Sequence, residues 1–321
     1  MAPLECHLYA LEPQARERVW GGQFLHPADP PIGEEWVAYG PSRVSGGPCD
    51  GLSVDDLAER HGADLLGTTV AGRFGTRFPL LVKLLDCADW LSVQVHPNDE
   101  QALRMVGPNE FGKTEAWYFL STSAGAQIML GVNDGVTRED LVAAIRGGRV
   151  RDVAHLMDIQ AGESVLVPAG TLHALGPGIV LYEIQQASDT TYRVYDWDRP
   201  SSAGRQLHVE QSIEVAAAVG PARLTRPTIP TGTDSTDSVD SRYFDLDLLR
   251  ATEESGAFVA DTHGQSFHIL TVIEGAAEIE WGDERLALGR FGTALVAGSA
   301  GEYRIGAVGG PVKVLRAAVP D

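Results

Sequence analysis

The amino-acid sequence predicts a mainly β protein, in which antiparallel sheets roll into two barrels or sandwiches with a small helical portion. Two observations lead to this expectation. Short β-branched runs recur between turn residues, and glycine is abundant, with 36 residues in a chain of 321. Such spacing is typical of all-β barrels and sandwiches. The clearest predicted strands are 78–85, 91–96, 117–120, 165–167 and 179–184, followed by 269–275 and 276–281.

Helical signals are few. Ser53 and Thr137 stand at N-cap positions before acidic residues, which is the usual beginning of a helix. A short helix between His96 and Glu115 would separate these residues in the sequence while leaving their strands adjacent. The predicted helices cover about 53–66, 98–106 and 137–158.

A polar stretch, at about residues 224–241, divides the chain. It is rich in Thr, Pro, Ser and Asp and nearly lacks apolar side chains, which is typical of a linker. Beyond it, Leu295–Gly298 parallels Leu166–Ala169, but Glu302 stands where His173 would fall. We therefore expect a degenerate second barrel with a structural role. The predicted division is a first domain 1–223, a linker 224–241 and a C-terminal domain 242–321.

Composition excludes several classes of partner. The formal charge of −19 argues against nucleic acid and anionic membranes, and an anionic substrate would need a local cluster of Lys and Arg. Three scattered cysteines, Cys6, Cys49 and Cys87, indicate free thiols in a reducing compartment. Because neither a signal peptide nor an apolar run of roughly 20 residues is found, we predict a soluble, cytoplasmic protein. The oligomeric state stays open.

Three segments together predict a metal site. Gln94 and His96 lie two positions apart in an apolar, β-branched run, so on a strand both side chains project from one face. The segment from Gly162 to His173 places a histidine just past a strand and a Pro-Gly turn. Glu115 opens a third strand-like run. Two imidazoles, one carboxylate and one amide oxygen suit a zinc-like divalent ion.

Each of these residues also has an ordinary interpretation. Gln94 could bond neighbouring backbone, as strand amides often do. Lys113 shares a strand face with Glu115, so the two could form an ion pair or line one cavity. Isolated histidines are usually plain polar residues. The histidines without ligand spacing are His7, His26, His61, His155, His208, His263 and His268.

Two further residues indicate chemistry. Glu183 lies in a mostly apolar strand, where a carboxylate is costly unless it has a partner or a chemical role. Arg193 follows a polar turn, and its planar guanidinium suits an anion such as phosphate. The ordinary alternative is a surface ion pair of Arg193 with Asp189 or Asp196.

Several stretches carry a resemblance to a known family: Lys83–Asp86, Leu91–Asp99, Gly112–Trp117, Pro168–Ala174 and Glu183–Arg199. At these residues the chain resembles the type I mannose-6-phosphate isomerases, zinc-dependent enzymes of the cupin superfamily, and most closely the short bacterial form. The resemblance covers most of residues 1–220 and is most specific across 80–200.

The resemblance implies two cupin-type jelly-roll barrels and a catalytic first domain. One Zn²⁺ per chain would be held by Gln94, His96, Glu115 and His173. The family's active-site lysine, acid and essential arginine fall on Lys113, Glu183 and Arg193, and two positions near its pocket fall on Ser92 and Asp189. The chain departs from the pattern at Glu34–Gly40, which follows it only loosely, and after His173, where the generic cupin asparagine is absent.

The implied reaction interconverts mannose 6-phosphate and fructose 6-phosphate through a cis-enediol, which needs a base, an oxyanion stabiliser and a phosphate anchor. Glu183 is the candidate base, with Lys113 or a metal-held water as alternatives. Arg193 would hold the phosphate or stabilise the enediolate. Lys83 is a second phosphate candidate, unless it is a solvated lysine at a strand end.

Two other function classes stay open on the residues alone. One is a non-catalytic cupin that binds a sugar phosphate. The other is a metal-dependent cupin oxygenase, which Gln94 disfavours because such sites prefer three nitrogen ligands.

Overall fold

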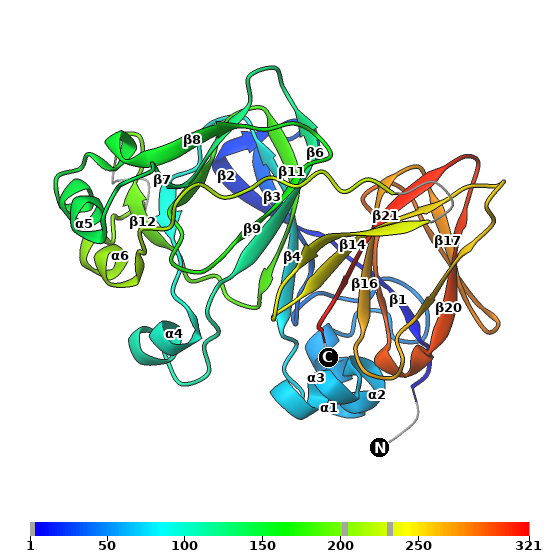
Figure 1. Cartoon of the computed structure of the whole chain (residues 1–321). Coiled ribbons are helices and arrows are strands. Elements are labelled where there is room, and N and C mark those ends of the chain that lie inside the picture. Colours follow the sequence, from blue (N-terminus) through cyan, green and yellow to red (C-terminus); the bar gives the residue numbers. More distant parts are fainter. Residues whose placement is uncertain (1–3, 201–204, 230–233, 321) are drawn as a thin grey trace. The chain divides into compact units, whose positions relative to one another are not determined.

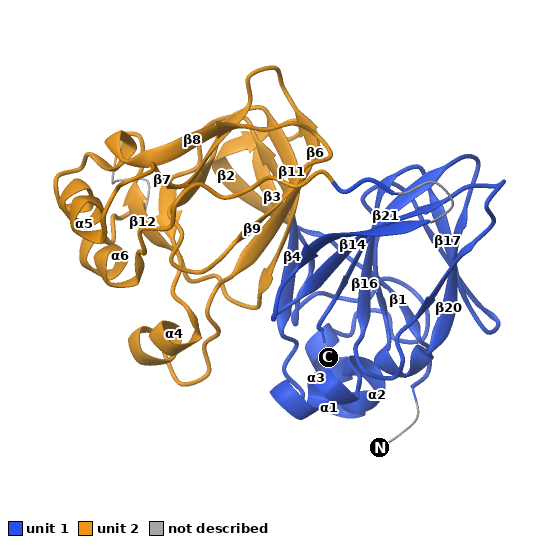
Figure 2. Ribbon diagram, in the orientation of Figure 1, with its two compact units in different colours: residues 1–14, 36–83, 227–321 blue, residues 15–35, 84–226 orange. Residues whose placement is uncertain are grey.

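The structure is a computed structural model that describes residues 4–200, 205–229 and 234–320 (Figure 1). The chain forms two compact units (Figure 2). Unit 1 consists of residues 1–14, 36–83 and 227–321, and unit 2 of residues 15–35 and 84–226. The sheets are antiparallel, so the prediction of a mainly β chain with small helical insertions is confirmed. None of the described helices is long and apolar enough to cross a bilayer.

Unit 1 contains a six-stranded sheet of order β1-β19-β16-β21-β14-β13 and a four-stranded sheet of order β15-β20-β17-β18. Apolar side chains of both sheets, such as Leu270 and Tyr303, form one buried cluster. The strands of unit 1 are β1 (Leu8–Leu11), β13 (Ser235–Asp240), β14 (Asp245–Ala251), β15 (Phe258–Asp261), β16 (His268–Glu274), β17 (Ala277–Trp281), β18 (Glu284–Leu288), β19 (Thr293–Val296), β20 (Glu302–Ala307) and β21 (Val312–Ala318). Its helices are α1 (Val54–His61), α2 (Ala63–Leu66), α3 (Thr68–Phe74) and the 3₁₀ turn η3 (Gly298–Ala300).

Unit 2 is built around a six-stranded sheet of order β2-β3-β4-β11-β6-β9 and a five-stranded sheet of order β12-β5-β10-β7-β8. Strands β3 and β4 each begin or end in unit 1. The strands are β2 (Gln14–Gly22), β3 (Ile32–Ala38), β4 (Leu80–Cys87), β5 (Val93–Val95), β6 (Glu115–Thr122), β7 (Gln127–Val132), β8 (Ala154–Asp158), β9 (Ser164–Val167), β10 (His173–Leu175), β11 (Ile179–Gln186) and β12 (Tyr192–Tyr195). The helices are α4 (Asp99–Met105), α5 (Arg138–Arg146), α6 (Val209–Val215) and the 3₁₀ turn η1 (Val150–Asp152).

The central strands β5 and β10 of the five-stranded sheet of unit 2 are covered on both faces. On its outer face Val93 and Val95 pack with Leu141 of α5 and Val215 of α6, and Figure 1 shows both helices beside β12. Side chains alternate along a strand, so Gln94 between the two valines belongs to the inner face. That inner face and the six-stranded sheet share a core of apolar side chains. The functional residues therefore lie inside a two-sheet core.

The helix predictions hold only in part. The segment predicted at 53–66 is split by Gly62, whose φ of +52° is not helical, into α1 and α2. The prediction of a helix over 137–158 is wrong beyond α5, because Gly147 and Gly148 end the helix and β8 pairs with β7. The short helix α4 is confirmed, with Asn98 as its N-cap. Helices α3 and α6 were not predicted, because both lack a side-chain N-cap.

The compact units also differ from the predicted division at 224–241. Residues 235–240 of that segment form β13, an edge strand paired with β14, and residues 230–233 lie outside the described residues. The first strand, β1, pairs with β19, and Phe267 N donates to Leu66 O at 3.0 Å. These long-range bonds place the N-terminal strand and the helices α1 to α3 in unit 1 with the C-terminal strands.

Unit 1 carries a carboxyl group that should make its stability depend on pH. Burial, followed by the nearby carboxylates of Asp240 and Asp247, raises the pKa of Asp245 to about 6. Because the pKa of this carboxyl in the folded state lies above its ordinary value near 4, the folded state holds the proton more tightly than the unfolded chain does. The stabilisation is complete below pH 4 and is lost as the pH rises through 6. The variant Asp245→Asn should therefore be more stable than the parent at pH 8, by about 1 kcal/mol once solvent screening is allowed for.

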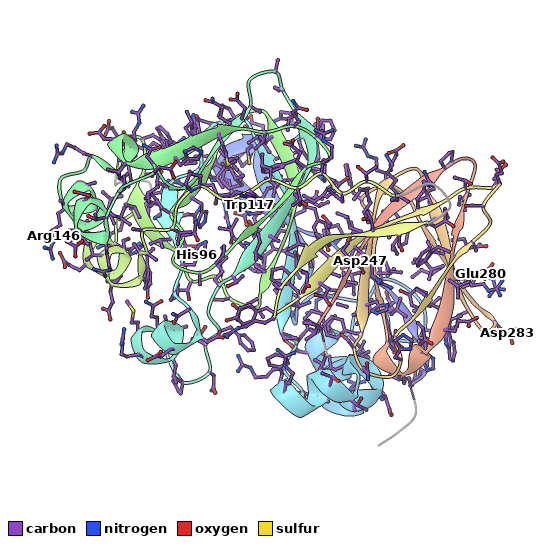
Figure 3. All side chains as sticks on the ribbon, viewed as in Figure 1. His96, Trp117, Arg146, Asp247, Glu280 and Asp283 are labelled. Carbon is purple, nitrogen blue, oxygen red and sulfur yellow. The ribbon has the colours of Figure 1, made fainter. Side chains whose placement is uncertain are left out.

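Thermal unfolding at pH 8, 6 and 4 tests this prediction, and the advantage should shrink toward pH 4. The matched control is Asp283→Asn, which removes one negative charge at an exposed turn of the same unit (Figure 3). A Tm difference for Asp245→Asn that does not change with pH would contradict the assignment.

Candidate metal centre and adjoining cavity

The three segments that the sequence predicts to converge are bound to one another by their backbones. Lys113 N donates to Pro97 O at 2.9 Å, and Gly170 N donates to His96 O at 2.9 Å. Gly170 has a φ of +84°, a backbone conformation that residues with a side chain rarely adopt. A Cβ at this position would lie 3.1 Å from Val215 O. The turn before His173 therefore needs glycine to hold its position against the strand that carries His96.

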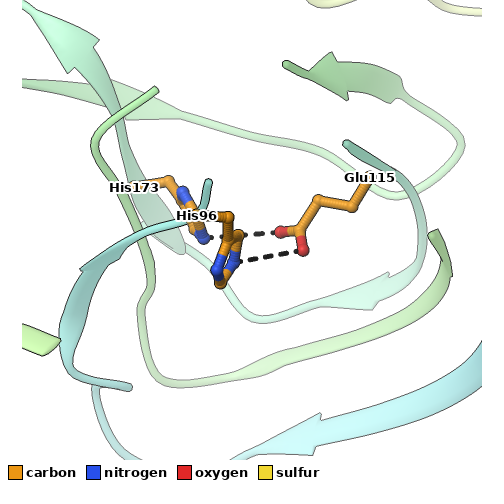
Figure 4. Close-up of side chains that lie close together, drawn as sticks. All are labelled: His96, Glu115 and His173. Carbon is orange, nitrogen blue, oxygen red and sulfur yellow. Dashed lines mark ion pairs between the residues drawn. The ribbon is translucent and has the colours of Figure 1, made fainter. Parts of the chain in front are cut away.

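Three predicted ligands meet in the interior of unit 2 (Figure 4). The Nε2 atoms of His96 and His173 each lie 3.4 Å from a different carboxylate oxygen of Glu115. Their candidate ligand atoms all lie within 4.8 Å of one another. All three side chains are at most 2 % exposed. Three separate strands thus deliver two imidazoles and one carboxylate to one buried point.

Backbone carbonyl groups orient both imidazoles. His96 Nδ1 lies 3.0 Å from Thr190 O, and His173 Nδ1 lies 2.8 Å from Thr171 O. A carbonyl only accepts, so each Nδ1 carries the hydrogen and each Nε2 keeps its lone pair toward Glu115. Burial, followed by Lys113, lowers the pKa of His96 to about 3, and burial also lowers the pKa of His173. Both rings are therefore in the neutral form that binds metals.

Glu115 is held as a carboxylate. Burial alone would raise its pKa, but the positive charge of Lys113 outweighs burial and keeps the pKa well below the ordinary value. Lys113 Nζ lies 3.0 Å from Glu115 Oε2 and 3.1 Å from His96 Nε2. Lys113 is itself only 4 % exposed. Of the two predicted alternatives for this lysine, ion pair or cavity lining, the structure therefore has the ion pair.

A divalent cation fits this donor set. His173 Nε2 and Glu115 Oε2 are buried and have no hydrogen-bond partner, although Oε2 has its ion-pair contact with Lys113. An unsatisfied buried polar atom costs about 1–3 kcal/mol, which a metal ion would offset. Among the described residues no other group of His, Cys, Asp and Glu offers three ligand atoms as close together. Imidazole nitrogen with carboxylate oxygen is the ligand chemistry that zinc prefers.

Gln94 lies in line with this centre. On the five-stranded sheet its Cα partner is His173 of β10 on one side and Arg193 of β12 on the other. Opposed residues of neighbouring strands project from the same face, so these three side chains form one row on the inner face. The role of Gln94 as a fourth ligand stays a prediction.

A cavity of about 410 Å³ adjoins this row. Four predicted site residues line it: Ser92, Gln94, Asp189 and Arg193. The sequence analysis missed the four other charged residues of the lining, which are Glu17, Arg18, Glu34 and Arg205. Arg18 Nε and Glu34 Oε1 form an ion pair of 2.8 Å. Strand alternation places Arg18 on the same face as buried Trp20, and that pattern was the available signal.

Three arginines line the cavity. Among the described residues, Arg193 is the one of the three that forms no ion pair with a carboxylate. Its Nε donates to Ser92 Oγ at 3.2 Å and its Nη1 to Gln206 O at 3.1 Å. Asp196 instead pairs with Arg205 at 2.5 Å and with Arg199 at 3.2 Å. The surface-pair alternative for Arg193 is therefore wrong. Burial, followed by repulsion from Arg205, lowers the pKa of Arg193, and the charge of Asp196 offsets part of this shift.

Glu183 lies beside the metal centre through a tryptophan that the sequence analysis missed. Trp117 Nε1 donates to Glu183 Oε2 at 3.2 Å, and the two residues are opposed on β6 and β11. The Trp117 ring meets the His173 ring edge to face, with centroids 5.6 Å apart. Figure 3 labels Trp117 and His96 among the sheets of unit 2. One indole thus contacts both a metal ligand and the candidate base.

Lys83 is buried rather than solvated, with 4 % exposure, so the alternative of a solvated strand-end lysine is wrong. Its Nζ lies 5.3 Å from the centroid of the Trp36 ring, a cation–π contact within unit 1. Its role toward phosphate stays a prediction.

Comparison with known proteins agrees with this site. Residues 8–115 match the family described as phosphomannose isomerase type I, catalytic domain. A mannose-6-phosphate isomerase of Streptococcus mutans is 37% identical over 292 residues, which are 87% of this chain and 88% of that protein.

Solved structures share the whole fold. The crystal structure of the mannose 6-phosphate isomerase from Bacillus subtilis superposes with a TM-score of 0.84 at 30% identity, over 97% of this chain and 99% of the other. A mannose 6-phosphate isomerase crystallised with zinc and yttrium has the same fold, with a TM-score of 0.77 at 17% identity over 98% and 100% of the two chains.

Proposed function

The chain belongs to the type I phosphomannose isomerase family, and from this premise we propose that it is a zinc-dependent aldose–ketose isomerase that interconverts mannose 6-phosphate and fructose 6-phosphate. One observation carries the proposal. The inner face of one sheet leads from a buried group of two histidines and one glutamate to an arginine at a cavity, and this arginine forms no ion pair with a carboxylate among the described residues. The first supplies a place for a cation, and the second a place for an anionic substrate.

We propose that His96, Glu115 and His173 hold one zinc ion, with Gln94 as the fourth ligand. Bound there, zinc supplies Lewis-acid stabilisation of negative charge on the substrate oxygens. The buried donors support this assignment because two of their atoms are otherwise unsatisfied. All of these residues belong to unit 2, so we propose that unit 2 is the catalytic part and that unit 1 has a structural role.

The proton transfer between C1 and C2 falls to Glu183. Its carboxylate is 4 % exposed, so it works in a water-poor environment. Trp117 Nε1 holds one of its oxygens, which fixes the direction of the other. The ammonium of Lys113 adds positive charge beside Glu115, where an enediolate oxygen would gain from it. The cis-enediolate forms when Glu183 removes the proton from C2 of the aldose. It collapses to the ketose when Glu183 returns that proton to C1 and a proton passes from O2 to O1.

We propose that the phosphate binds in the arginine-lined cavity. Arg193 keeps hydrogen-bonding capacity for an anion, Arg205 lies close enough to perturb its pKa, and Ser92 orients its Nε. Arg193, whose guanidinium forms no ion pair among the described residues, is the positive charge that a chain of net charge −19 offers an anionic substrate here. Lys83 remains the second candidate for the phosphate.

Family membership supports isomerisation over the two rival classes. A silent binding protein has no need of a buried carboxylate held by an indole beside the metal ligands. An oxygenase would be expected to carry a third nitrogen ligand, and the row position beside His173 holds Gln94.

Removing the metal should abolish turnover reversibly. Extended dialysis against a chelator should lower mannose 6-phosphate isomerisation by at least about 100-fold, because the oxyanion then lacks its main stabiliser. A coupled assay for fructose 6-phosphate measures the loss, and one equivalent of zinc should restore the rate. Proton exchange at C2 of the substrate, followed by NMR in D₂O, separates turnover from mere binding. Activity that persists in protein free of metal by elemental analysis would sink the proposal.

A further inference from the structure

Two of the three cysteines meet in unit 1. Cys6 Sγ and Cys49 Sγ lie 4.0 Å apart although the residues are 43 positions apart in the sequence. Both are free thiols, as the sequence predicts. Cys49 is 4 % exposed, whereas Cys6 is half-buried and therefore reachable by a small reagent. The third thiol, Cys87, is 1 % exposed.

The backbone around both sulfur atoms is fixed. Next to Cys6, His7 stacks on Trp281 with ring centroids 3.6 Å apart, and its backbone N donates to Glu284 at 3.0 Å. The turn that carries Cys49 is joined to β1, since Ser45 N donates to Ala10 O at 2.9 Å. The short distance between the thiols therefore follows from the contacts that hold the segments of Cys6 and Cys49 in unit 1.

We propose that Cys6 and Cys49 form an oxidisable dithiol, a modification site that closes to a disulfide without rearrangement of unit 1. An S–S bond is about 2.0 Å long, so the two sulfur atoms need to approach by about 2 Å, which rotation about the Cα–Cβ bonds can supply. This site is separate from the proposed isomerase centre, whose ligands belong to unit 2.

With hydrogen peroxide as oxidant the chemistry balances. The thiolate of Cys6 attacks one peroxide oxygen, the O–O bond breaks, and Cys6 sulfenic acid and hydroxide result. The hydroxide takes up the proton that the Cys6 thiol released, which gives one water. Cys49 sulfur then attacks the Cys6 sulfur, the S–O bond breaks, and a second water leaves with the Cys49 proton. The two thiols lose two electrons together, and the peroxide gains them.

The surroundings make the first step slow. Burial, followed by the neighbouring Cys49, raises the pKa of Cys6 to about 12, and burial also raises the pKa of Cys49. Thiolate is therefore scarce at neutral pH. Once formed, the bond ties the segment before β1 to the turn before α1, which restricts the unfolded chain and stabilises unit 1.

The test is prolonged treatment of the full-length protein with hydrogen peroxide at pH 8. Titration of thiols in denaturant should fall from three to one, and non-reducing peptide mapping should show Cys6 linked to Cys49. The Tm should rise by about 5–10 °C and return after dithiothreitol. The matched control Cys87→Ser should keep both the link and the Tm rise.

The variants Cys6→Ser and Cys49→Ser should each lose the disulfide and the Tm rise. If serine at the buried position of Cys49 prevents folding, Cys6→Ser at the half-buried position still tests the proposal. Three outcomes would overturn the proposal. They are three thiols remaining after oxidation, a Cys6 sulfinic acid without the link, and a link between two chains in place of the intramolecular one.

Discussion

His173→Ala should remove both the bound zinc and the isomerase activity. His173 Nε2 lies 3.4 Å from Glu115 and is the ring atom that faces the metal position, because Nδ1 is committed to Thr171 O. Alanine has no side-chain atom that could replace it. With one of the buried donors gone, affinity for zinc should collapse. Turnover of mannose 6-phosphate should fall by about 1000-fold or more, which corresponds to about 4 kcal/mol of lost transition-state stabilisation.

Two measurements check the result: zinc content of the purified variant by elemental analysis, and kcat/KM in the coupled assay. The matched control is His155→Ala, a histidine of unit 2 whose ring contacts only Asn133, at 3.4 Å, among the hydrogen bonds found. The control should keep zinc and activity. If His173→Ala retained one equivalent of zinc and near-parental turnover, the metal centre would have to be placed elsewhere.

Arg193→Ala should have the opposite pattern, with zinc retained and activity lost. Arg193 touches Ser92 and Gln206 and none of the three buried metal-binding residues. Its loss should lower kcat/KM by about 100-fold to 10,000-fold, as expected when a charged hydrogen bond to an anion is removed from a cavity.

The kinetics also separate the two roles that the sequence left open for this residue. A rise in KM with kcat kept indicates a phosphate anchor, whereas equal losses in kcat and kcat/KM indicate an interaction made only with the enediolate. Arg193→Lys should recover part of the loss by restoring charge without the planar fork. The matched control is Arg146→Ala on α5, an exposed arginine that pairs with Glu210 (Figure 3). Full activity in Arg193→Ala would exclude both roles.

The candidate metal ligands were accessible from sequence because their signal is local. The alternation of a β-strand alone places Gln94 and His96 on one face, and the Pro-Gly turn alone places His173 at the start of β10. The meeting of these segments with Glu115 depends on strand pairing, but each segment carries its own ligand and its own turn. The predicted convergence of His96, Glu115 and His173 therefore needed no knowledge of the sheet order. Their role as metal ligands stays a prediction.

What the sequence could not supply depends on partners far along the chain. Arg205 and Arg18 look like ordinary surface charges until β2 and the segment after β12 meet at one cavity. In the same way, β13 consists largely of polar residues and is a strand only because β14 offers it an edge. Propensity is a weak guide where tertiary pairing decides the conformation.

The pairing of β1 with β19 has a consequence for how the protein is made. During synthesis β1 leaves the ribosome well before its partner strand β19. Unit 2, whose residues end at 226, has all its strands available while β1 still lacks β19, although the other edge of β1 already bonds to residues 43–45. Contacts between such distant residues form slowly, so the nascent chain carries an unpaired N-terminal edge through most of translation, when association with other chains is the main hazard.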